Sequence, residues 1–419
     1  MGFRFIHAAD IHLDSPLRGL SAYENAPAEQ LRNASREALK GLVNTAIEDK
    51  VSFVVFAGDL YDGDWRDYNT GIFFAAQMGR LAKVGIRAFV LYGNHDAESE
   101  MTKKLSLPDN VVTFSSKSAQ VHKIEELKVA LHGQSFANRA VEENLAASYK
   151  SKVNDYFNIG VLHTALEGYA AHPNYAPCKV DELHAKGYDY WALGHVHEFQ
   201  RWDGPSTIVF PGNLQGRHVR ETGRKGAVSV TVDDSGHSVV DRLYLDVLRW
   251  EVLKVDVSQC ATLEDVARRV GRGMAGLLEA DNVPRAARVV LEGKTRLHGT
   301  LFGNTAVVRA QVLANAAAID AELLWVEKVK VATTPLEAER PSGESHEALG
   351  ELQAIFSEAC EDPEFLAGLK EQLQPFLNKV SDELNEDVPL LTLARQERFA
   401  DIVREVAPGL LEQLSTKVV

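Results

Sequence analysis

Residue types that bind divalent cations recur at the ends of apolar runs in the first half of this 419-residue sequence. Such runs are typical of buried strands in a largely parallel sheet. In an open α/β sheet, ligands bind beyond the carboxyl ends of the strands, so we expect one site assembled from five segments. The runs and their final polar residues are 3–12 with Asp10 and His12, 52–59 with Asp59, 88–96 with Asn94 and His95, 158–163 with His163, and 188–197 with His195 and His197.

Seven of these side chains form a mixed set of imidazole, carboxylate and amide groups. Such a set suits manganese, iron or zinc better than calcium or magnesium, which prefer oxygen ligands. A single buried histidine is more simply explained by a structural role, but the joint occurrence at five strand ends favours a centre for two divalent cations. We expect Asp59, in the middle of the sheet, to bridge the ions. The predicted ligands are Asp10, His12, Asp59, Asn94, His163, His195 and His197.

A pair of cations predicts a phosphate ester as the substrate. Two ions about 3.5 to 4 Å apart lower the pKa of a shared water and stabilise the attacking and leaving oxygens in a displacement at phosphorus. We therefore expect a hydroxide that bridges the metals to be the nucleophile. His95 is the predicted general acid that protonates the leaving oxygen, and either Asp62 or Asp96 is expected to keep its imidazole charged.

A polar loop follows the last of these runs, with the sequence GNLQGRH at 212–218. Backbone N–H groups of a glycine-rich loop and a guanidinium are suited to hold a phosphate. We therefore interpret Arg217 and His218 as substrate-binding residues. The alternative is a simple turn whose polar side chains are solvated.

Helical patterns separate the first three runs. Apolar residues recur at helical spacing in 28–49 and again in 70–83, which gives a βαβαβ order and a largely parallel sheet. Short strand-like runs without helices follow at 111–136 and 207–245, and we expect them to complete a second sheet with antiparallel strands. The predicted fold class is α/β, with residues 1–248 forming a sandwich of two sheets flanked by helices.

The rest of the chain changes character at about residue 249. Residues 249–333 alternate strand and helix patterns and predict a small α+β domain. Residues 334–349 have the Pro, Gly, Ser and Glu content of a linker. Residues 350–419 predict short acidic, amphipathic helices interrupted by Pro375 and Pro408. These helices either dock onto a partner protein or pack against their own chain, and the sequence leaves both open.

Charge and composition bear on which partners the chain can bind and on where in the cell it is expected. The net charge is −14, and the segment from residue 338 onward, with 17 acidic and 7 basic residues, accounts for −10 of it. The acidic excess therefore does not prevent the part of the chain before residue 338 from binding a polyanion. Three widely spaced cysteines indicate reduced thiols, and no apolar run approaches the roughly 20 residues that span a bilayer. We find no signal peptide and expect a cytoplasmic protein without membrane association.

The motifs together resemble the calcineurin-like metallophosphoesterase superfamily. The resemblance implies that Asp59 bridges one metal held by Asp10, His12 and His197 and a second held by Asn94, His163 and His195. The sequences HAADIHLDSPLRGL and FPGNLQGRHVRETG, with the small domain, are most similar to DNA double-strand-break repair nucleases of the SbcD-like and especially the YhaO-like type. The motifs that carry the superfamily resemblance are Asp10-x-His12, Gly58-Asp59, Gly93-Asn94-His95-Asp96, His163 and Gly194-His195-x-His197.

This resemblance implies a manganese-dependent DNA exonuclease whose small domain caps the site and guides duplex DNA. It also implies an ATPase partner of the SbcC or structural-maintenance type, bound through the C-terminal helices, and by analogy a homodimer. One position departs from the pattern, because these nucleases often have histidine where this chain has Asp62. The alternatives are a hydrolase of small phosphate esters and a non-catalytic adaptor for an ATPase.

Overall fold

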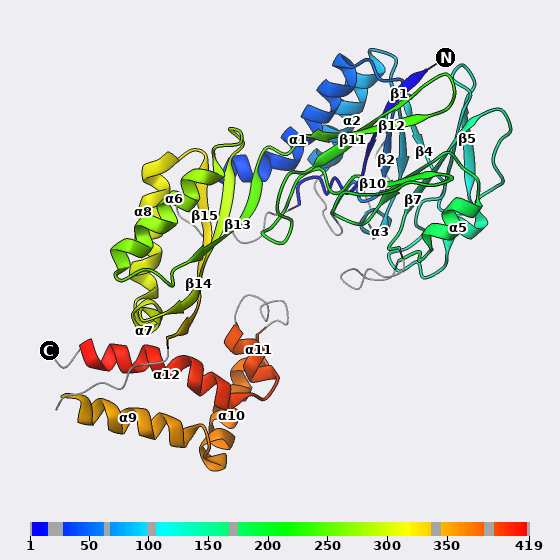
Figure 1. The fold of residues 1–419 in the computed structure, drawn as a ribbon. Helices are drawn as coiled ribbons and strands as arrows, with labels where there is room; N and C mark the ends of the chain where they lie inside the picture. Colours follow the sequence, from blue (N-terminus) through cyan, green and yellow to red (C-terminus); the bar gives the residue numbers. More distant parts are fainter. Residues whose placement is uncertain are drawn as a thin grey trace. The chain divides into compact units, whose positions relative to one another are not determined.

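The computed structural model describes residues 2–15, 28–62, 68–98, 106–166, 175–336, 345–380 and 389–416. The chain divides into two compact units (Figure 1). The first comprises Met1–Glu251 with Asn282–Ala286, and the second comprises Val252–Asp281 with Ala287–Val419.

The first unit contains a six-stranded sheet with the order β12-β11-β1-β2-β3-β4. Strands β1 to β4 are parallel to one another, whereas β11 and β12 run antiparallel to their neighbours. Helices α1 (Ala28–Glu48) and α2 (Tyr68–Ala82) bury Leu39, Leu42 and Phe74 in one apolar core with Ile6 and Val54 of this sheet. The strands are β1 (Phe3–Ala8), β2 (Phe53–Ala57), β3 (Arg87–Leu91), β4 (Val111–Thr113), β11 (Gly226–Val232) and β12 (Ser238–Tyr244).

A second six-stranded sheet in the same unit has the order β5-β6-β7-β8-β10-β9. The two sheets share a core in which the Phe5 and Phe53 rings stack 4.9 Å apart and Tyr190 packs edge-on against Phe5. Helix α5 (Val180–Ala185) and the short 3-10 helix η1 (Leu145–Ser148) contribute to a further core beyond the second sheet. The predicted α/β sandwich is confirmed. The strands are β5 (Gln120–Ile124), β6 (Val129–Gly133), β7 (Phe157–His163), β8 (Tyr190–Gly194), β9 (Gln200–Trp202) and β10 (Thr207–Phe210).

Two details of the expected sheets are wrong. Strands β4, β11 and β12 extend the first sheet rather than the second, and β10 is parallel to β8. The alternation of apolar residues shows that a segment is a strand but does not show which sheet accepts it, because both sheets offer similar apolar surfaces. In addition, the five strand ends do not share one sheet: β1, β2 and β3 belong to the first, and β7 and β8 to the second.

The second unit contains most of a three-stranded sheet with the order β13-β14-β15. Its strands are β13 (Arg249–Asp256), β14 (Arg285–Thr295) and β15 (Leu324–Pro335). Helices α6 (Leu263–Leu277) and α8 (Thr305–Asp320) lie side by side against this sheet (Figure 1). Thr262 caps α6 reciprocally with Asp265. Helix α7 (His298–Gly303) was not predicted from the sequence.

The C-terminal helices are α9 (Ser345–Ala359), α10 (Pro363–Leu377), α11 (Pro389–Arg395) and α12 (Phe399–Thr416). Leu377, Leu391 and Phe399 share a small core, and α12 contacts α7 and α9, so these helices pack on their own chain. The expected interruption at Pro375 is wrong, since α10 continues to Leu377, and α12 runs through position 408. Of the predicted linker, 337–344 lies outside the described residues.

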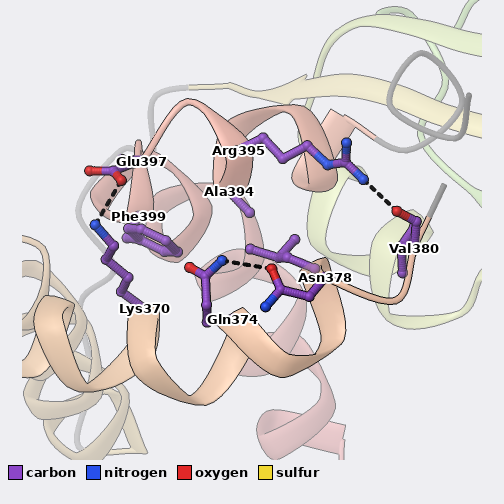
Figure 2. A pocket seen from close by; sticks show the side chains of 9 residues that line it. Lys370, Gln374, Asn378, Val380, Ala394, Arg395, Glu397 and Phe399 are labelled. Carbon is purple, nitrogen blue, oxygen red and sulfur yellow. Dashed lines mark hydrogen bonds and ion pairs between the residues drawn. The ribbon is translucent and has the colours of Figure 1, made fainter. Parts of the chain in front are cut away.

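An open cavity of about 590 Å³ lies among α10, α11 and α12 (Figure 2). Lys370 pairs with Glu397 at one side of it, and Arg395 donates a hydrogen bond to the carbonyl of Val380 at the other. None of the residues at the five strand ends lines this cavity. Within the described ranges, no helix is long and apolar enough to cross a membrane.

Candidate metal centre

The ends of five strands bring all the predicted ligands together in the first unit. Each of the seven side chains follows or completes its strand, and six of them are buried, while His197 is partly exposed. Asp10 and His12 follow β1, Asp59 follows β2, Asn94 begins the short helix α3 (Asn94–Glu98) after β3, His163 ends β7, and His195 and His197 follow β8.

Asp10, His12 and His197 form one group of facing ligand atoms. The Nε2 atoms of His12 and His197 lie 3.3 Å apart, and Nε2 of His197 lies 3.8 Å from Oδ1 of Asp10. The Asp10 carboxylate also accepts hydrogen bonds from the backbone N–H of His195 at 2.9 and 3.1 Å. The strand end after β8 therefore fixes the orientation of the carboxylate that follows β1.

Asp59, His163 and His195 form a second group. Nε2 of His163 lies 2.9 Å from Oδ1 of Asn94 and 3.4 Å from Oδ2 of Asp59. The same Oδ2 atom lies 3.9 Å from Nε2 of His12, which belongs to the first group. Asp59 therefore stands between the two groups, at the position that a bridging ligand requires.

The hydrogen bonds of two histidines show that this donor set fits divalent cations. Nδ1 of His163 lies 3.0 Å from the carbonyl of Ala57, and Nδ1 of His197 lies 2.8 Å from the Glu221 carboxylate. Carbonyl and carboxylate oxygens only accept, so Nδ1 carries a proton and Nε2 is the ring atom left to bind a cation.

Burial alone would lower the pKa of His163, but the charge of Asp59 raises it to about 9, so a cation bound at Nε2 would displace a proton from that atom. Nε2 of His163 faces Oδ1 of Asn94 and the Asp59 carboxylate, and Nε2 of His197 faces the Asp10 carboxylate. With that proton displaced, several acceptor atoms thus face one another, and a cation bound between them would satisfy them all.

Four of the predicted ligands have left-handed backbone conformations. The φ angles are 50° at Asp10, 43° at His12, 50° at Asp59 and 106° at His195. Such conformations are uncommon for residues with a Cβ atom and cost about 1 to 3 kcal/mol each. Backbone hydrogen bonds from Asp10 to Gly58 and from His12 to Asp59 hold two of these turns in place. The sharp turns aim the ligands into one site.

Glycines leave space for the ligands at the strand ends. A Cβ atom on Gly93 would lie 2.3 Å from Oδ1 of Asp59, and one on Gly58, whose φ is 98°, would lie 2.2 Å from Nδ1 of His163. Both distances are shorter than van der Waals contact. The glycines that precede Asp59 and Asn94 in the sequence are therefore part of the site.

Gly93→Ala is expected to displace Asp59 and to destabilise the fold by about 1 to 3 kcal/mol, the usual cost of overpacking. The measurement is thermal unfolding with and without Mn²⁺, where the variant should lose most of the stabilisation that the metal gives. Gly79→Ala is the matched control, since a Cβ atom at Gly79 in α2 meets nothing within 4 Å. If both variants gain the same stability from Mn²⁺, the role of Gly93 is contradicted.

His95 and Asp62 form a pair beside the ligands. Nδ1 of His95 lies 3.1 Å from Oδ1 of Asp62, and the His95 side chain is 29% exposed. Asp62 also lies 3.6 Å from His12 and accepts a hydrogen bond from Ser15 at 2.7 Å. Burial alone would lower the pKa of His95, but the hydrogen bond to Asp62 and the charge of Asp59 raise it, which favours the imidazolium.

Asp96 has a different role from Asp62. Its buried carboxylate accepts backbone hydrogen bonds from Leu60 at 3.0 Å, Tyr61 at 2.8 Å and Gly93 at 3.0 Å. It therefore ties the turn after β2 to the turn after β3. Of the two carboxylates that the sequence offered as the partner of His95, Asp62 is the one that contacts it.

Arg217 and His218 lie at the edge of the same cluster. Nη2 of Arg217 lies 2.9 Å from Oε1 of Glu221 and Nη1 lies 4.0 Å from Asp62. Nε2 of His218 lies 3.6 Å from Glu221. Sequence reasoning missed Glu221, and it also missed Lys225, whose Nζ donates to the carbonyl of His197 at 2.7 Å. The signals for them were the segment FPGNLQGRHVRETG, which contains Glu221, and the charged run RHVRETGRK, which begins in the glycine-rich loop and contains both residues.

Comparisons with known families agree with this geometry. The family model of calcineurin-like phosphoesterases matches residues 3–199, which contain all seven candidate ligands. The family model of the middle domain of metallophosphoesterase YhaO matches residues 250–334.

Individual proteins that are similar in sequence agree with these two family models. The chain is 34% identical over 293 residues to the uncharacterized metallophosphoesterase YhaO of Bacillus subtilis, covering 69% of this chain and 71% of that one. It is 23% identical to the DNA double-strand break repair protein Mre11 of Sulfurisphaera tokodaii, covering 61% and 66% of the two chains. It is 25% identical to Mre11 of Methanopyrus kandleri, covering 64% and 63%. The chain therefore belongs to the YhaO-like group of calcineurin-like metallophosphoesterases, which makes it a metal-dependent phosphoester hydrolase.

Proposed function

We propose that this protein is a nuclease that hydrolyses phosphodiester bonds of DNA with two divalent cations, of which manganese is the expected ion. The observation that carries the proposal is the His95–Asp62 pair, a proton donor held by a carboxylate beside the seven candidate ligands. Cleavage of a phosphodiester releases an alkoxide that needs a proton, which this pair is placed to supply. The names of the Mre11 relatives support DNA as the substrate.

The residues of the chain have separate tasks in this reaction. When bound, two cations would activate water and stabilise negative charge on the attacking and leaving oxygens. Asp59 joins the two groups of ligands, and Asp62 keeps the imidazole of His95 oriented and charged. Arg217, which is 17% exposed, is placed at the edge of the cluster, where its guanidinium is suited to hold a phosphate oxygen.

A row of arginines and aromatic rings near the site favours a polynucleotide over a small ester. The guanidinium of Arg242 lies 4.7 Å from the ring centre of Phe199 and 4.9 Å from that of Tyr244, and Arg224 lies 4.8 Å from the Tyr244 ring. Phe199 is two residues from His197, and Tyr244 is 47% exposed. Exposed cationic and aromatic groups in alternation are suited to phosphates and stacked bases.

Arg242→Ala is expected to weaken binding of single-stranded DNA by about tenfold, because it removes both a phosphate contact and the support of two rings. It should leave hydrolysis of bis(4-nitrophenyl) phosphate unchanged, since that substrate has a single phosphate group and no further nucleotides to bind along the row. The measurement is a fluorescence anisotropy titration with labelled DNA at several salt concentrations. Arg201→Ala, which removes an arginine paired with Asp203, is the matched control. Equal DNA affinity in both variants would exclude the row from binding.

We also propose that residues 249–333 guide duplex DNA and that the C-terminal helices bind an ATPase subunit of the structural-maintenance type, in the cytoplasm. Arg268 and Arg272 on α6 are exposed, which supports the first role. Exposed apolar side chains on α9 and α10 support the second, including Ile355 at 57%, Phe365 at 46% and Phe376 at 56% exposure.

The test of the proposed function is cleavage of end-labelled linear duplex and single-stranded DNA with added Mn²⁺, beside bis(4-nitrophenyl) phosphate. Digestion of DNA that requires Mn²⁺ and His95 would support the nuclease. Hydrolysis of the small diester without any cleavage of DNA, with the purified chain or with an ATPase subunit added, would instead favour a small-ester phosphodiesterase.

A further inference from the structure

Glu221 is a buried carboxylate within the segment FPGNLQGRHVRETG, and the sequence alone assigned it no role. It is 7% exposed and accepts hydrogen bonds at both oxygens. Oε1 lies 2.8 Å from Nδ1 of His197 and 2.9 Å from Nη2 of Arg217. Oε2 lies 2.7 Å from the backbone N of Arg217 and 2.9 Å from Nδ2 of Asn213. One carboxylate therefore contacts a candidate metal ligand, a candidate phosphate-binding residue and the loop between them.

These contacts use the acceptor capacity of the carboxylate fully. A carboxylate offers about four lone-pair sites, and here four donor groups lie within 3.0 Å of its oxygens, with Nε of Arg217 as a fifth donor at 3.3 and 3.4 Å. Nδ1 of His197 lies 3.3 Å from Nη2 of Arg217 but only 2.8 Å from Oε1 of Glu221. Donation from Nδ1 to this closer oxygen sets the tautomer that leaves Nε2 of His197 facing Asp10 and His12. A hydrogen-bonded carboxylate behind a ligating histidine orients the ring and raises its basicity, which strengthens its bond to a metal.

The second contact fixes Arg217. Its guanidinium donates to Glu221 through Nη2, while Nη1 lies 4.0 Å from Asp62, the partner of His95. The guanidinium therefore spans the distance between the carboxylate behind the metal ligand and the carboxylate behind the proton donor. With Glu221 removed, Arg217 would lose its closest anionic partner and would be drawn toward Asp62.

We infer that Glu221 is a positioning residue that serves two functions, ordering His197 for metal binding and Arg217 for the substrate phosphate. The inference rests on the metal centre of the proposed function, but it does not depend on DNA as the substrate. A merely structural role, in which Glu221 closes the loop from Asn213, would change stability without changing metal affinity. The two roles are therefore separable by experiment.

Glu221→Gln is the informative change, because glutamine keeps the shape of the side chain but loses its charge and half of its acceptor capacity. Mn²⁺ binding to the metal-free protein by calorimetry should weaken by about 10- to 100-fold, the usual effect of removing the hydrogen-bond partner of a ligating histidine. At saturating Mn²⁺, KM for bis(4-nitrophenyl) phosphate should rise. Arg217→Ala should raise KM with unchanged Mn²⁺ affinity, and the double variant should raise KM less than the product of the single effects.

Glu198→Gln is the matched control, since Glu198 is an exposed glutamate adjacent to His197 and should change neither quantity. Wild-type Mn²⁺ affinity in a folded Glu221→Gln variant with a lowered melting temperature would overturn the inference and leave the metal centre standing. Absence of Mn²⁺ binding by the wild type would overturn the metal centre and the inference with it. If Glu221→Gln does not fold, Glu221→Asp applies the same test, with unchanged Mn²⁺ affinity again decisive against the inference.

Discussion

His95→Ala lowers kcat for phosphodiester cleavage by about 10²- to 10⁴-fold in our account, which is the usual contribution of a general acid. His95 and Asp62 form a third group of facing ligand atoms with His12, but neither belongs to the two groups that Asp59 joins, and His95 pairs with Asp62 at 3.1 Å. We therefore expect the metal content not to change. The backbone N–H of His95, which donates to Oδ1 of Asp59 at 3.0 Å, is retained in the variant. The measurement is steady-state hydrolysis of DNA and of bis(4-nitrophenyl) phosphate, with bound manganese quantified in the same samples.

Two further variants define the role of His95. His237→Ala removes an exposed histidine on the surface and should have wild-type activity. Asp62→Asn keeps His95 but weakens a charge-assisted hydrogen bond worth about 1.5 to 3 kcal/mol, so kcat should fall by roughly 10- to 100-fold. A wild-type kcat in His95→Ala would remove His95 from the mechanism. An Asp62→Asn variant as inactive as His95→Ala but depleted of metal would show that Asp62 acts on the ligands through His12.

Asp59→Asn should reduce metal-dependent hydrolysis by at least about 10³-fold, because it removes the only carboxylate placed between the two groups among the described residues. The metal-free variant should be less stable than the wild type. Burial alone would raise the pKa of Asp59, but the neighbouring His163 and His12 hold it well below its usual range, so the charged carboxylate stabilises the metal-free fold. The measurement is thermal unfolding with and without Mn²⁺, together with activity.

The wild type should gain stability from the metal, about 2.7 kcal/mol at a free concentration of one hundred times Kd, and Asp59→Asn should gain little. Asp49→Asn is a suitable control, because Asp49 is an exposed aspartate at the end of α1. Full Mn²⁺ stabilisation and full activity in Asp59→Asn would contradict its position as the bridge.

Much of this site follows from the sequence because each ligand type stands at the end of an apolar run. The runs that end at Asp10, Asp59 and His163 are buried strands for an elementary reason: contiguous apolar side chains must leave water on both faces of a sheet. Parallel strands then bring their carboxyl ends to one edge. The motif spacing therefore predicts proximity without any knowledge of distances.

The sequence could not show how two sheets share the site. Periodicity does not reveal that β7 and β8 lie in a different sheet from β1, or that β11 joins β1, since these are choices among equivalent apolar surfaces. The left-handed turns at Asp10 and His195 are also invisible, because backbone strain of this kind is stabilised by contacts with distant residues. Glu221 was missed for a related reason: its partners lie 4, 8 and 24 residues away, and residues 213–221 form neither a helix nor a strand whose repeat would place them on one face.

The most direct test of the two-metal centre is a crystal structure with Mn²⁺, with data collected to record the anomalous scattering of manganese. We expect two anomalous peaks about 3.5 to 4 Å apart, one on each side of Asp59. His12 and His197 should contact one peak through Nε2, and His163 and Asn94 should contact the other. A single peak, or peaks away from Asp59 in crystals that contain Mn²⁺ at saturating concentration, would contradict the two-metal centre on which the proposed hydrolysis depends.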